Sequence, residues 1–365
     1  MPQTLCLNMI VKNEARVIRR CLDSVRPFIH HWVIVDTGST DGTQDLVKKH
    51  LSDLPGDLYE RPWKNFGHNR SEALELARGK ADYILIMDAD EVLEVPTGYR
   101  LPELSDEQYM LLHRHRSSAE TSWELGTLVK GSMPWRYEGV LHEHIACDEP
   151  HQRTPLPGPI VWGYFDSARN VDPKKKYAND ARILEEALKD ESGNARYVFY
   201  LAQSYRDSDQ IDKAIQTYER RAAMGGWEEE VYYALYQVAV LKARARHDAK
   251  SIVTAFLNAY QYRPTRAEAL VELAGHYRGT HEWSLAELFA RAALSIPRPP
   301  DILFVDSSVY EWRVLDELAI ATYYTKKYEE SAALNRRLLA EGKLPEGHRA
   351  RIEQNLDFCK PHLAR

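Results

Sequence analysis

The sequence has few cysteines and no excess of positive charge. Its 365 residues include only Cys6, Cys21, Cys147 and Cys359, and no two of these form a CxxC pair. This spacing disfavours a cysteine-held metal centre or a disulfide scaffold, so we expect four reduced, mostly buried thiols. The formal net charge of -6 gives no overall electrostatic drive toward nucleic acid, which makes nucleic acid an unexpected partner.

No apolar run near the start is long enough to cross a membrane. The stretch 5–11 is not preceded by a basic leader or followed by a small-residue cleavage site, and Lys12 comes directly after it. It predicts a buried first strand rather than a membrane span or an export signal, and a cytoplasmic protein. Hydrophobic residues make up 44% and charged residues 28%, which is typical of globular chains, and the length suffices for two domains.

In the first half, short apolar runs alternate with amphipathic stretches. The pattern predicts strands at 5–11, 32–35, 57–61 and 83–87, and helices at 14–25, 41–51 and 68–78. Unbroken apolar strands that alternate with helices indicate an α/β domain whose mostly parallel sheet is covered on both faces. Ligands of such sheets bind outside the carboxyl ends of the strands, so the residues that follow each strand matter most.

The second half is helical throughout and repetitive. Two sets of apolar positions are separated by two periods of about 36 residues, a third set is looser, and the stretch 230–262 is a degenerate copy. These repeats resemble tetratricopeptide (TPR) repeats and predict an all-α domain at 171–365 after a sheet domain at 1–170. We expect their aromatic side chains to form repeat core rather than a ligand box. The three sets are Leu201, Ala202, Tyr205, Ile211, Ala214, Tyr218; Leu273, Ala274, Tyr277, Trp283, Ala286, Ala290; and Leu318, Ala319, Tyr328, Ser331.

An acidic residue ends the second predicted strand. Asp36 is followed by Gly38, which allows a tight turn, and by residues 39–41, which can cap the next helix. A carboxylate at this place can accept hydrogen bonds from a base N–H or from ribose hydroxyls. An ordinary capped strand-turn-helix junction is the alternative.

Three acidic residues follow the strand predicted at 83–87. Asp88 and Asp90 are two positions apart, so on extended backbone they point to the same side and can share one ion, with Glu91 next to them. Carboxylate oxygens suit Mg²⁺ or Mn²⁺, with diphosphate oxygens completing the coordination. A solvated acidic turn is the simpler alternative.

The motifs together resemble those of family 2 glycosyltransferases over about residues 4–165. The resemblance implies a GT-A (Rossmann-like) fold, a nucleoside-diphosphate sugar donor, UDP-sugar by family habit, bound Mn²⁺ or Mg²⁺, and transfer with inversion. It implies further that a turn and Asp36 hold the nucleoside, that Asp88 lies near ribose and metal, and that Asp90 ligates the metal. The motifs are residues 8–14 (NMIVKNE), 35–43 (VDTGSTDGT) and 87–90 (MDAD), and the turn comprises Val11, Asn13 and Glu14.

Two arginines are candidates for contacts with the donor diphosphate. Arg70 opens a predicted helix in a region that often reaches the donor in this family, and a guanidinium can grip a diphosphate with two hydrogen bonds. Arg169, in the segment that leads to the repeats, could stabilise the leaving diphosphate. For each arginine the alternative is an ordinary solvated side chain.

The segment 135–144 (WRYEGVLHEH) resembles one that closes the active site in peptide-modifying, repeat-bearing members of the family. On an expected strand, His142 and His144 share one face and Glu143 points away. His142 could complete the metal shell or serve as a base, and Glu143 or His144 could deprotonate an acceptor hydroxyl or thiol. Many members carry an E-D dipeptide before a Q-x-x-R-W motif, and both are absent here. The general base therefore does not carry over from the resemblance.

The predicted function is transfer of a sugar to a peptide, protein or glycan acceptor, which the repeats could dock. A non-catalytic repeat scaffold with a vestigial first domain is one alternative. A sugar-phosphate nucleotidyltransferase is another, although residues 8–14 lack the Gly-rich basic loop that such enzymes carry after the first strand.

Overall fold

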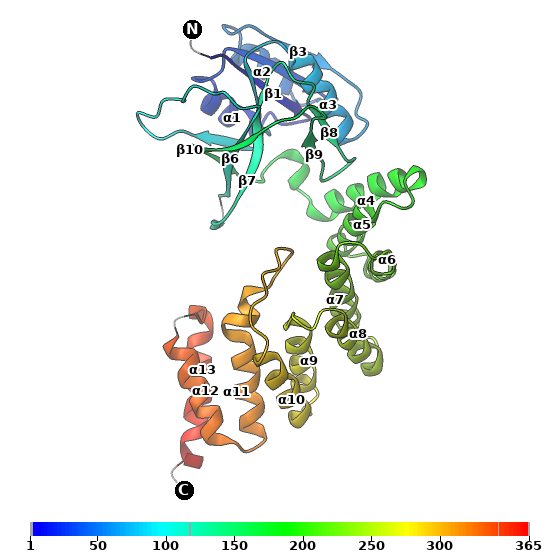
Figure 1. Ribbon diagram of the computed structural model, residues 1–365, viewed down its shortest axis with the longest axis vertical. Helices are drawn as coiled ribbons and strands as arrows, with labels where there is room; N and C mark the ends of the chain where they lie inside the picture. The colour runs from blue at the N-terminus through cyan, green and yellow to red at the C-terminus, as the bar shows by residue number, and fades with distance from the viewer. Residues whose placement is uncertain (1–2, 117, 342, 364–365) are drawn as a thin grey trace. The chain divides into compact units, whose positions relative to one another are not determined.

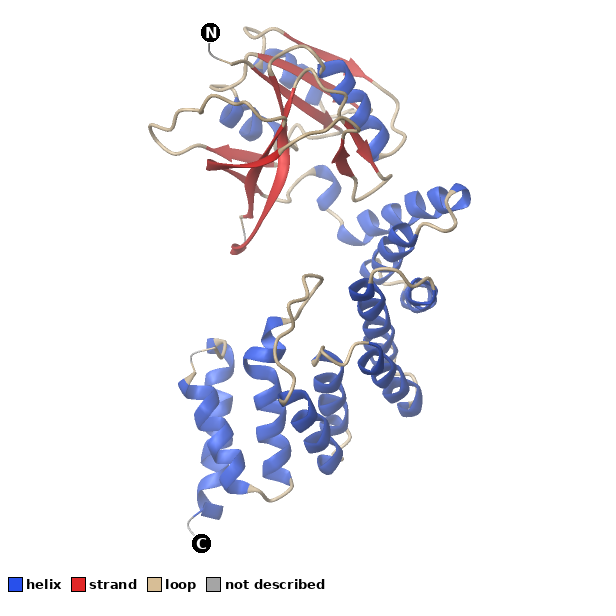
Figure 2. Cartoon of the chain, in the orientation of Figure 1, coloured by secondary structure: helices blue, strands red, loops and turns tan. Residues whose placement is uncertain are grey.

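A computed structural model describes residues 3–116, 118–341 and 343–363. The chain divides into two compact units, Met1–Asp190 and Glu191–Arg365. Strands occur only in the first unit among the described residues, and the second is built of helices (Figures 1 and 2). The sequence placed the domain boundary at 170/171, whereas helix α4 (Pro173–Asp190) falls within the first unit.

The first unit contains an eight-stranded sheet in the order β3-β2-β1-β4-β7-β6-β10-β5. The strands β1 to β4 run parallel, as the alternating pattern predicts, and β7 is antiparallel to both of its neighbours. Because Val11 pairs with Asp36 at the ends of β1 and β2, the carboxyl ends of these strands meet at one edge. The strands are β1 (Leu5–Val11), β2 (His31–Asp36), β3 (Gly56–Glu60), β4 (Tyr83–Ile86), β5 (Glu91–Glu94), β6 (Gln108–His115), β7 (Ser118–Lys130) and β10 (Arg153–Gly163).

Both faces of the sheet are covered, which explains why β1, β2 and β4 are mostly apolar and why the polar Asn8 of β1 is buried and hydrogen-bonded. Helix α1 (Ile18–Val25) shares one core with alternate residues of β1, and α2 (Thr43–His50) joins it. Helix α3 (Phe66–Ala77) packs in a second core with Cys6, Val33 and Ile84. A small hairpin of β8 (Arg136–Glu138) and β9 (His144–Ala146) contacts α3 on that face.

Helix starts differ from the predicted ones because of local capping. The helix expected from residue 14 begins at Ile18, since Glu14 and Val17 close a turn first. The helix expected from residue 68 begins at Phe66, because the Asn65 side chain accepts a hydrogen bond from the His68 amide at 2.8 Å and caps it.

The second unit consists of successive helices whose apolar faces pack on their neighbours. Tyr205 and Tyr218 are buried and Tyr277 stacks on Phe289 with ring centroids 5.5 Å apart, which confirms these aromatic positions as repeat core, whereas Trp283 is half-buried and stacks on the exposed Tyr324. In the described part of the chain, no helix is long and apolar enough to cross a membrane. The helices are α5 (Ala195–Asp207), α6 (Ile211–Ala223), α7 (Glu228–Arg244), α8 (Ala249–Tyr262), α9 (Glu268–Gly279), α10 (Trp283–Leu294), α11 (Val314–Tyr324), α12 (Tyr328–Ala340) and α13 (Glu346–Leu363), with a π-helical turn at Val309–Arg313.

The four cysteines are unpaired, as expected. Cys6, Cys21 and Cys359 are buried and Cys147 is partly buried. Burial raises the pKa of Cys6 to about 12, so this thiol stays protonated and behaves as a small apolar core residue.

Candidate active site

The Asp36 carboxylate is fully buried at the end of β2. Its Oδ1 accepts hydrogen bonds from the amides of Gly38 and Ser39, at 2.9 and 2.8 Å, and from the side chain of Gln44. Burial alone would raise the pKa of Asp36, but the Ser39 side chain together with these hydrogen bonds outweighs it and lowers the pKa. Its Oδ2 is buried and has no hydrogen-bond partner among residues 3–116, 118–341 and 343–363. A buried carboxylate oxygen without a donor is a strong local attraction for a ligand N–H or O–H.

The turn after β1 is fastened to the loop that follows Asp36. Asn13 has a φ of 58°, in the left-handed region that asparagine tolerates. Its amide donates to Ser39 Oγ and its Oδ1 accepts from the Thr40 amide, both at 2.8 Å. The structure therefore brings the predicted nucleoside residues of the two motifs together on one edge.

Arg70 lies between two carboxylates. Its Nη2 donates to Asp88 Oδ1 at 2.6 Å and its Nε donates to Glu143 Oε1 at 2.8 Å. Burial alone would lower the pKa of Arg70, but Asp88, Tyr137 and Glu143 raise it further above its usual range. Sequence reasoning selected Arg70, Asp88 and Glu143 separately, and the structure joins them. Binding of a diphosphate by Arg70 stays a prediction, because its guanidinium is already hydrogen-bonded to these two carboxylates.

Two further carboxylates lie under the segment that follows β10. Asp90 Oδ2 accepts from the Ser167 amide and Glu14 Oε2 accepts from the Ala168 amide, both at 3.2 Å. Burial, with added repulsion from Asp90 and Asp88, raises the pKa of Glu14 to about 7. Burial and the charge of Asp88 also raise the pKa of Asp90. The carboxylates of Glu14, Asp88 and Asp90 therefore lie near enough to repel one another at this edge of the sheet.

The segment over these carboxylates is held by residues that sequence reasoning missed. Arg20 on α1 forms a two-pronged ion pair with Asp166, at 2.7 and 3.2 Å, and its guanidinium lies 3.8 Å from the Tyr164 ring centroid. The lone signal available was the spacing of acidic and aromatic residues in 163–169, which does not reveal a partner on a distant helix.

The strand expected at 142–144 is wrong. His142 has a φ of 52° in a bend after Gly139, whose φ is 101°, and β9 begins only at His144. The face-sharing argument for His142 and His144 therefore fails. His142 and His144 are exposed, whereas Glu143 points inward with its side chain 11% exposed. Of the two base candidates, the geometry favours Glu143 over His144.

Arg169 already forms an ion pair within the first unit. Its guanidinium forms an ion pair with Asp180 of α4 and lies 4.4 Å from the Phe66 ring centroid. Its predicted role on the leaving diphosphate stays a prediction.

A cavity of about 310 Å³ lies beside Asp88, on the face of the sheet that carries the β8–β9 hairpin. It includes a contact between Glu91 and His113 that the sequence did not suggest: Glu91 Oε2 accepts from the Asp88 amide at 2.8 Å, and Glu91 Oε1 lies 3.5 Å from Nδ1 of the buried His113. Burial raises the pKa of Glu91. Residues around the cavity include Arg70, Asp88, Glu91, His113, Tyr137 and Glu143.

The donor set at this edge fits a hard divalent cation. Within the described ranges, no group of three or more His, Cys, Asp or Glu side chains is arranged to enclose an ion. Asp88 and Asp90 would therefore supply only two ligands and leave the other positions to water and diphosphate oxygens, the mode that Mg²⁺ favours. Burial is the main cause of the raised pKa values of Glu14 and Asp90, and repulsion among these carboxylates and Asp88 adds to it, so a cation bound there would relieve the repulsion.

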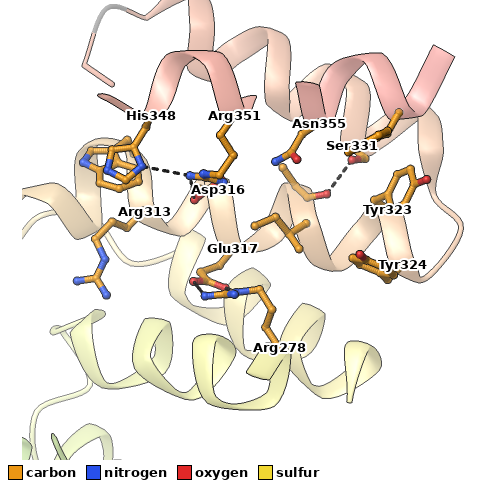
Figure 3. Close-up of a pocket in the computed structure, with 14 residues that line it drawn as sticks. Arg278, Arg313, Asp316, Glu317, Tyr323, Tyr324, Ser331, His348, Arg351 and Asn355 are labelled. Carbon is orange, nitrogen blue, oxygen red and sulfur yellow. Dashed lines mark hydrogen bonds and ion pairs between the residues drawn. The ribbon is translucent and has the colours of Figure 1, made fainter. Parts of the chain in front are cut away.

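A separate cavity of about 510 Å³ lies within the repeat unit (Figure 3). Arg278 donates to Glu317 at 2.7 Å, and Arg351 forms a two-pronged pair with Asp316 at 2.9 and 2.8 Å. Tyr323 and Tyr324 border the same cavity away from these pairs. This cavity therefore offers aromatic surface, together with charged side chains that already form ion pairs with one another.

Comparison with known proteins agrees with the two-part organisation. Residues 6–125 match the sequence model of glycosyl transferase family 2. A TPR repeat-containing protein of Synechococcus elongatus is 26% identical over 80% of this chain and 75% of its own length. The glycosyltransferase SunS of Bacillus subtilis is 23% identical over 58% of this chain, and the match spans only 51% of SunS.

Among solved structures, S. aureus TarS 1-349 in complex with UDP-GlcNAc resembles this chain with a TM-score of 0.38 and 14% identity. That alignment covers 72% of this chain and 92% of the TarS chain. The sequence family match identifies a glycosyltransferase family 2 domain in the first unit, at the residues that build the sheet edge described above.

Proposed function

We propose that this chain, which carries a glycosyltransferase family 2 domain, transfers a sugar from a nucleoside-diphosphate donor to an acceptor nucleophile. The observation that carries the proposal is the unpartnered Asp36 Oδ2, buried beside the Asn13 turn. A base N–H or a ribose hydroxyl would satisfy this oxygen. The choice of UDP rests on the family resemblance.

Asp88 and Asp90 would hold Mn²⁺ or Mg²⁺ with the donor diphosphate. When bound, the cation would neutralise charge on the departing nucleoside diphosphate. Arg70 holds the Asp88 carboxylate in place through its 2.6 Å hydrogen bond. His142 as a third ligand is part of the proposal and would require its side chain to turn toward Asp88.

The reaction would be a single displacement. The acceptor oxygen or sulfur attacks the anomeric carbon as the bond from that carbon to the diphosphate oxygen breaks, which inverts the configuration. Glu143 takes the acceptor proton, because it is turned inward beside the cavity and Arg70 orients it at 2.8 Å. The nucleoside diphosphate leaves with the electron pair of the broken bond.

The acceptor would be a peptide, protein or glycan. The aromatic and charged cavity of the repeat unit offers a place to recruit a larger acceptor-bearing molecule. We place the protein in the cytoplasm, in keeping with the expectation of reduced thiols.

A panel of nucleotide sugars, each incubated with Mn²⁺ or Mg²⁺ and assayed for release of the nucleoside diphosphate, tests the proposal. We expect turnover of at least one donor that EDTA abolishes and that Asp90→Ala reduces by about 100-fold or more. Equal release by Asp90→Ala would overturn the metal assignment. No release from any donor would favour the non-catalytic scaffold.

A further inference from the structure

We infer that the 310 Å³ cavity beside Asp88 binds a sugar ring of a glycan acceptor, and that Gln108 is a specificity-determining residue in it. The inference rests on the proposed function, because it takes Asp88 as part of the donor site. It narrows the acceptor class from peptide, protein or glycan to a polyhydroxylated ligand.

The first observation is an unsatisfied amide oxygen. Gln108 lines the cavity, is 1% exposed, and donates from Nε2 to the Gly126 carbonyl at 3.1 Å. Its Oε1 is buried and accepts no hydrogen bond from any residue that the structure describes. A buried amide oxygen left without a donor is costly, so a ligand hydroxyl that donates to it would bind with a clear advantage.

The second observation is the way the neighbouring strand makes room for this side chain. A Cβ at Gly126 of β7 would lie 2.1 Å from Gln108 Nε2. Because Gly126 has no side chain, the Gln108 amide can lie flat against β7 and hold its Oε1 in a fixed direction. The amide is thus positioned by two strands rather than left free to rotate.

The third observation is position. Gln108 pairs with Val129 of β7, and Val129 pairs with Ile84 of β4. The cavity therefore extends across β4, β7 and β6, with Asp88 at one end. Asp36 lies on β2, on the other side of β1. A nucleoside at Asp36 and a ligand in the cavity would therefore approach Asp88 from opposite sides, as a donor and an acceptor must.

The fourth observation is the chemistry of the lining. The residues around the cavity supply acceptors, which are the carboxylates of Asp88, Glu91 and Glu143 and the buried Gln108 Oε1. They also supply donors, among them the Arg153 guanidinium and the hydroxyl groups of Thr127 and Tyr137. The guanidinium of Arg70 is already engaged by two of these carboxylates.

Apolar side chains complete the cavity, among them Met110, Ile86 and Ile145. A ligand rich in hydroxyl groups, which both donate and accept hydrogen bonds, and with apolar C–H faces matches this lining. The volume lies at the small end of ligand sites, the size of a sugar rather than of a folded peptide.

Saturation-transfer NMR of the full chain with a panel of mono- and disaccharides tests the inference without requiring turnover. We expect at least one saccharide to bind the wild type, and Gln108→Leu to weaken that binding about tenfold. Gly126→Ala should weaken it as well, because the added methyl displaces the amide. Gln237→Leu, at a buried glutamine of the repeat unit, is the matched control and should bind as the wild type does.

Asp36→Asn separates this inference from the proposed function. If saccharide binding persists in Asp36→Asn while nucleotide binding is lost, the cavity is an acceptor subsite distinct from the nucleoside site. Displacement of the saccharide by UDP-sugar but not by UDP would identify the cavity as the place of the donor sugar and overturn the acceptor assignment. Equal binding by wild type and Gln108→Leu, or binding of peptides alone, would also overturn it.

Discussion

Arg70 Nη2 lies 2.6 Å from Asp88 Oδ1, and the same guanidinium reaches Glu143 through Nε. One side chain of α3 therefore sets the relative position of the proposed metal ligand and the proposed base. The two carboxylates come from distant parts of the chain, and Arg70 is only 14% exposed.

Replacement of Arg70 by lysine should separate these two carboxylates while it retains the positive charge. Because an ammonium group cannot make the two directed contacts, we expect kcat/KM for the donor to fall by about 100-fold. Arg78→Lys on the exposed end of the same helix is the control and should stay within about twofold of wild type. Steady-state donor turnover checks this, and wild-type activity in Arg70→Lys would contradict it.

Asp36→Asn should weaken nucleotide binding without unfolding the chain. The amide keeps the oxygen that accepts from Gly38 and Ser39, but it replaces the unpartnered Oδ2 by a donor. We expect the Kd for UDP to rise by about 10- to 100-fold. Isothermal calorimetry measures it, with the exposed Asp45→Asn on the neighbouring helix as control. An unchanged Kd would mean that Asp36 is only a turn-capping residue.

Glu14 should make stability depend on pH in the neutral range. Its pKa is about 7 in the folded chain against an ordinary value of 4.5, so between these values the folded state holds a proton that the unfolded state has released. The stabilisation is complete below the ordinary value and is lost as pH rises through about 7.

We therefore expect the melting temperature of the first unit to fall between about pH 5 and about pH 7, and to fall less in Glu14→Gln. Added Mg²⁺ should also flatten the profile, because a cation near Asp90 favours ionised Glu14. Glu75→Gln, at an exposed glutamate, is the control. Identical profiles for wild type and Glu14→Gln would contradict the expectation.

Gly67 marks a close approach between α3 and the turn before Glu143. A Cβ at this position would lie 2.1 Å from the backbone carbonyl oxygen of Gly139. Gly67→Ala should lower the unfolding free energy of the first unit by about 1–3 kcal/mol and reduce donor turnover. Chemical denaturation measures the first effect. Gly193→Ala is the control, because no described atom lies within 4 Å of a Cβ there, and a similar loss in both variants would contradict the account.

The sequence predicts where polar residues gather at the edge of the sheet, and it does so for a physical reason. Strands buried on both faces must be apolar throughout, so the polar residues that follow them, Asp36 and Asp88, stand out. In a parallel sheet these residues must meet at one edge, and the pairing of Val11 with Asp36 confirms it.

The part of the candidate site around His142 and Gln108 depends on contacts that sequence spacing does not encode. The strand predicted at 142–144 was wrong because His142 has a left-handed backbone conformation before β9, which breaks the alternation on which a strand argument relies. Gln108 faces Gly126 only because β6 and β7 pair in a register with irregularities. Such a register is set by the packing of the whole sheet and cannot be read from either strand alone.

The most direct test of the central claim is the affinity of UDP with and without Mn²⁺ for wild type and Asp90→Asn, with uridine as the reference ligand. If Asp36 holds the nucleoside and Asp88 and Asp90 hold the metal on the diphosphate, Mn²⁺ should tighten UDP binding to the wild type by about tenfold or more. The same addition should leave uridine binding unchanged and have little effect in Asp90→Asn. UDP affinity that is equal with and without Mn²⁺, or no UDP binding at all, would contradict the account.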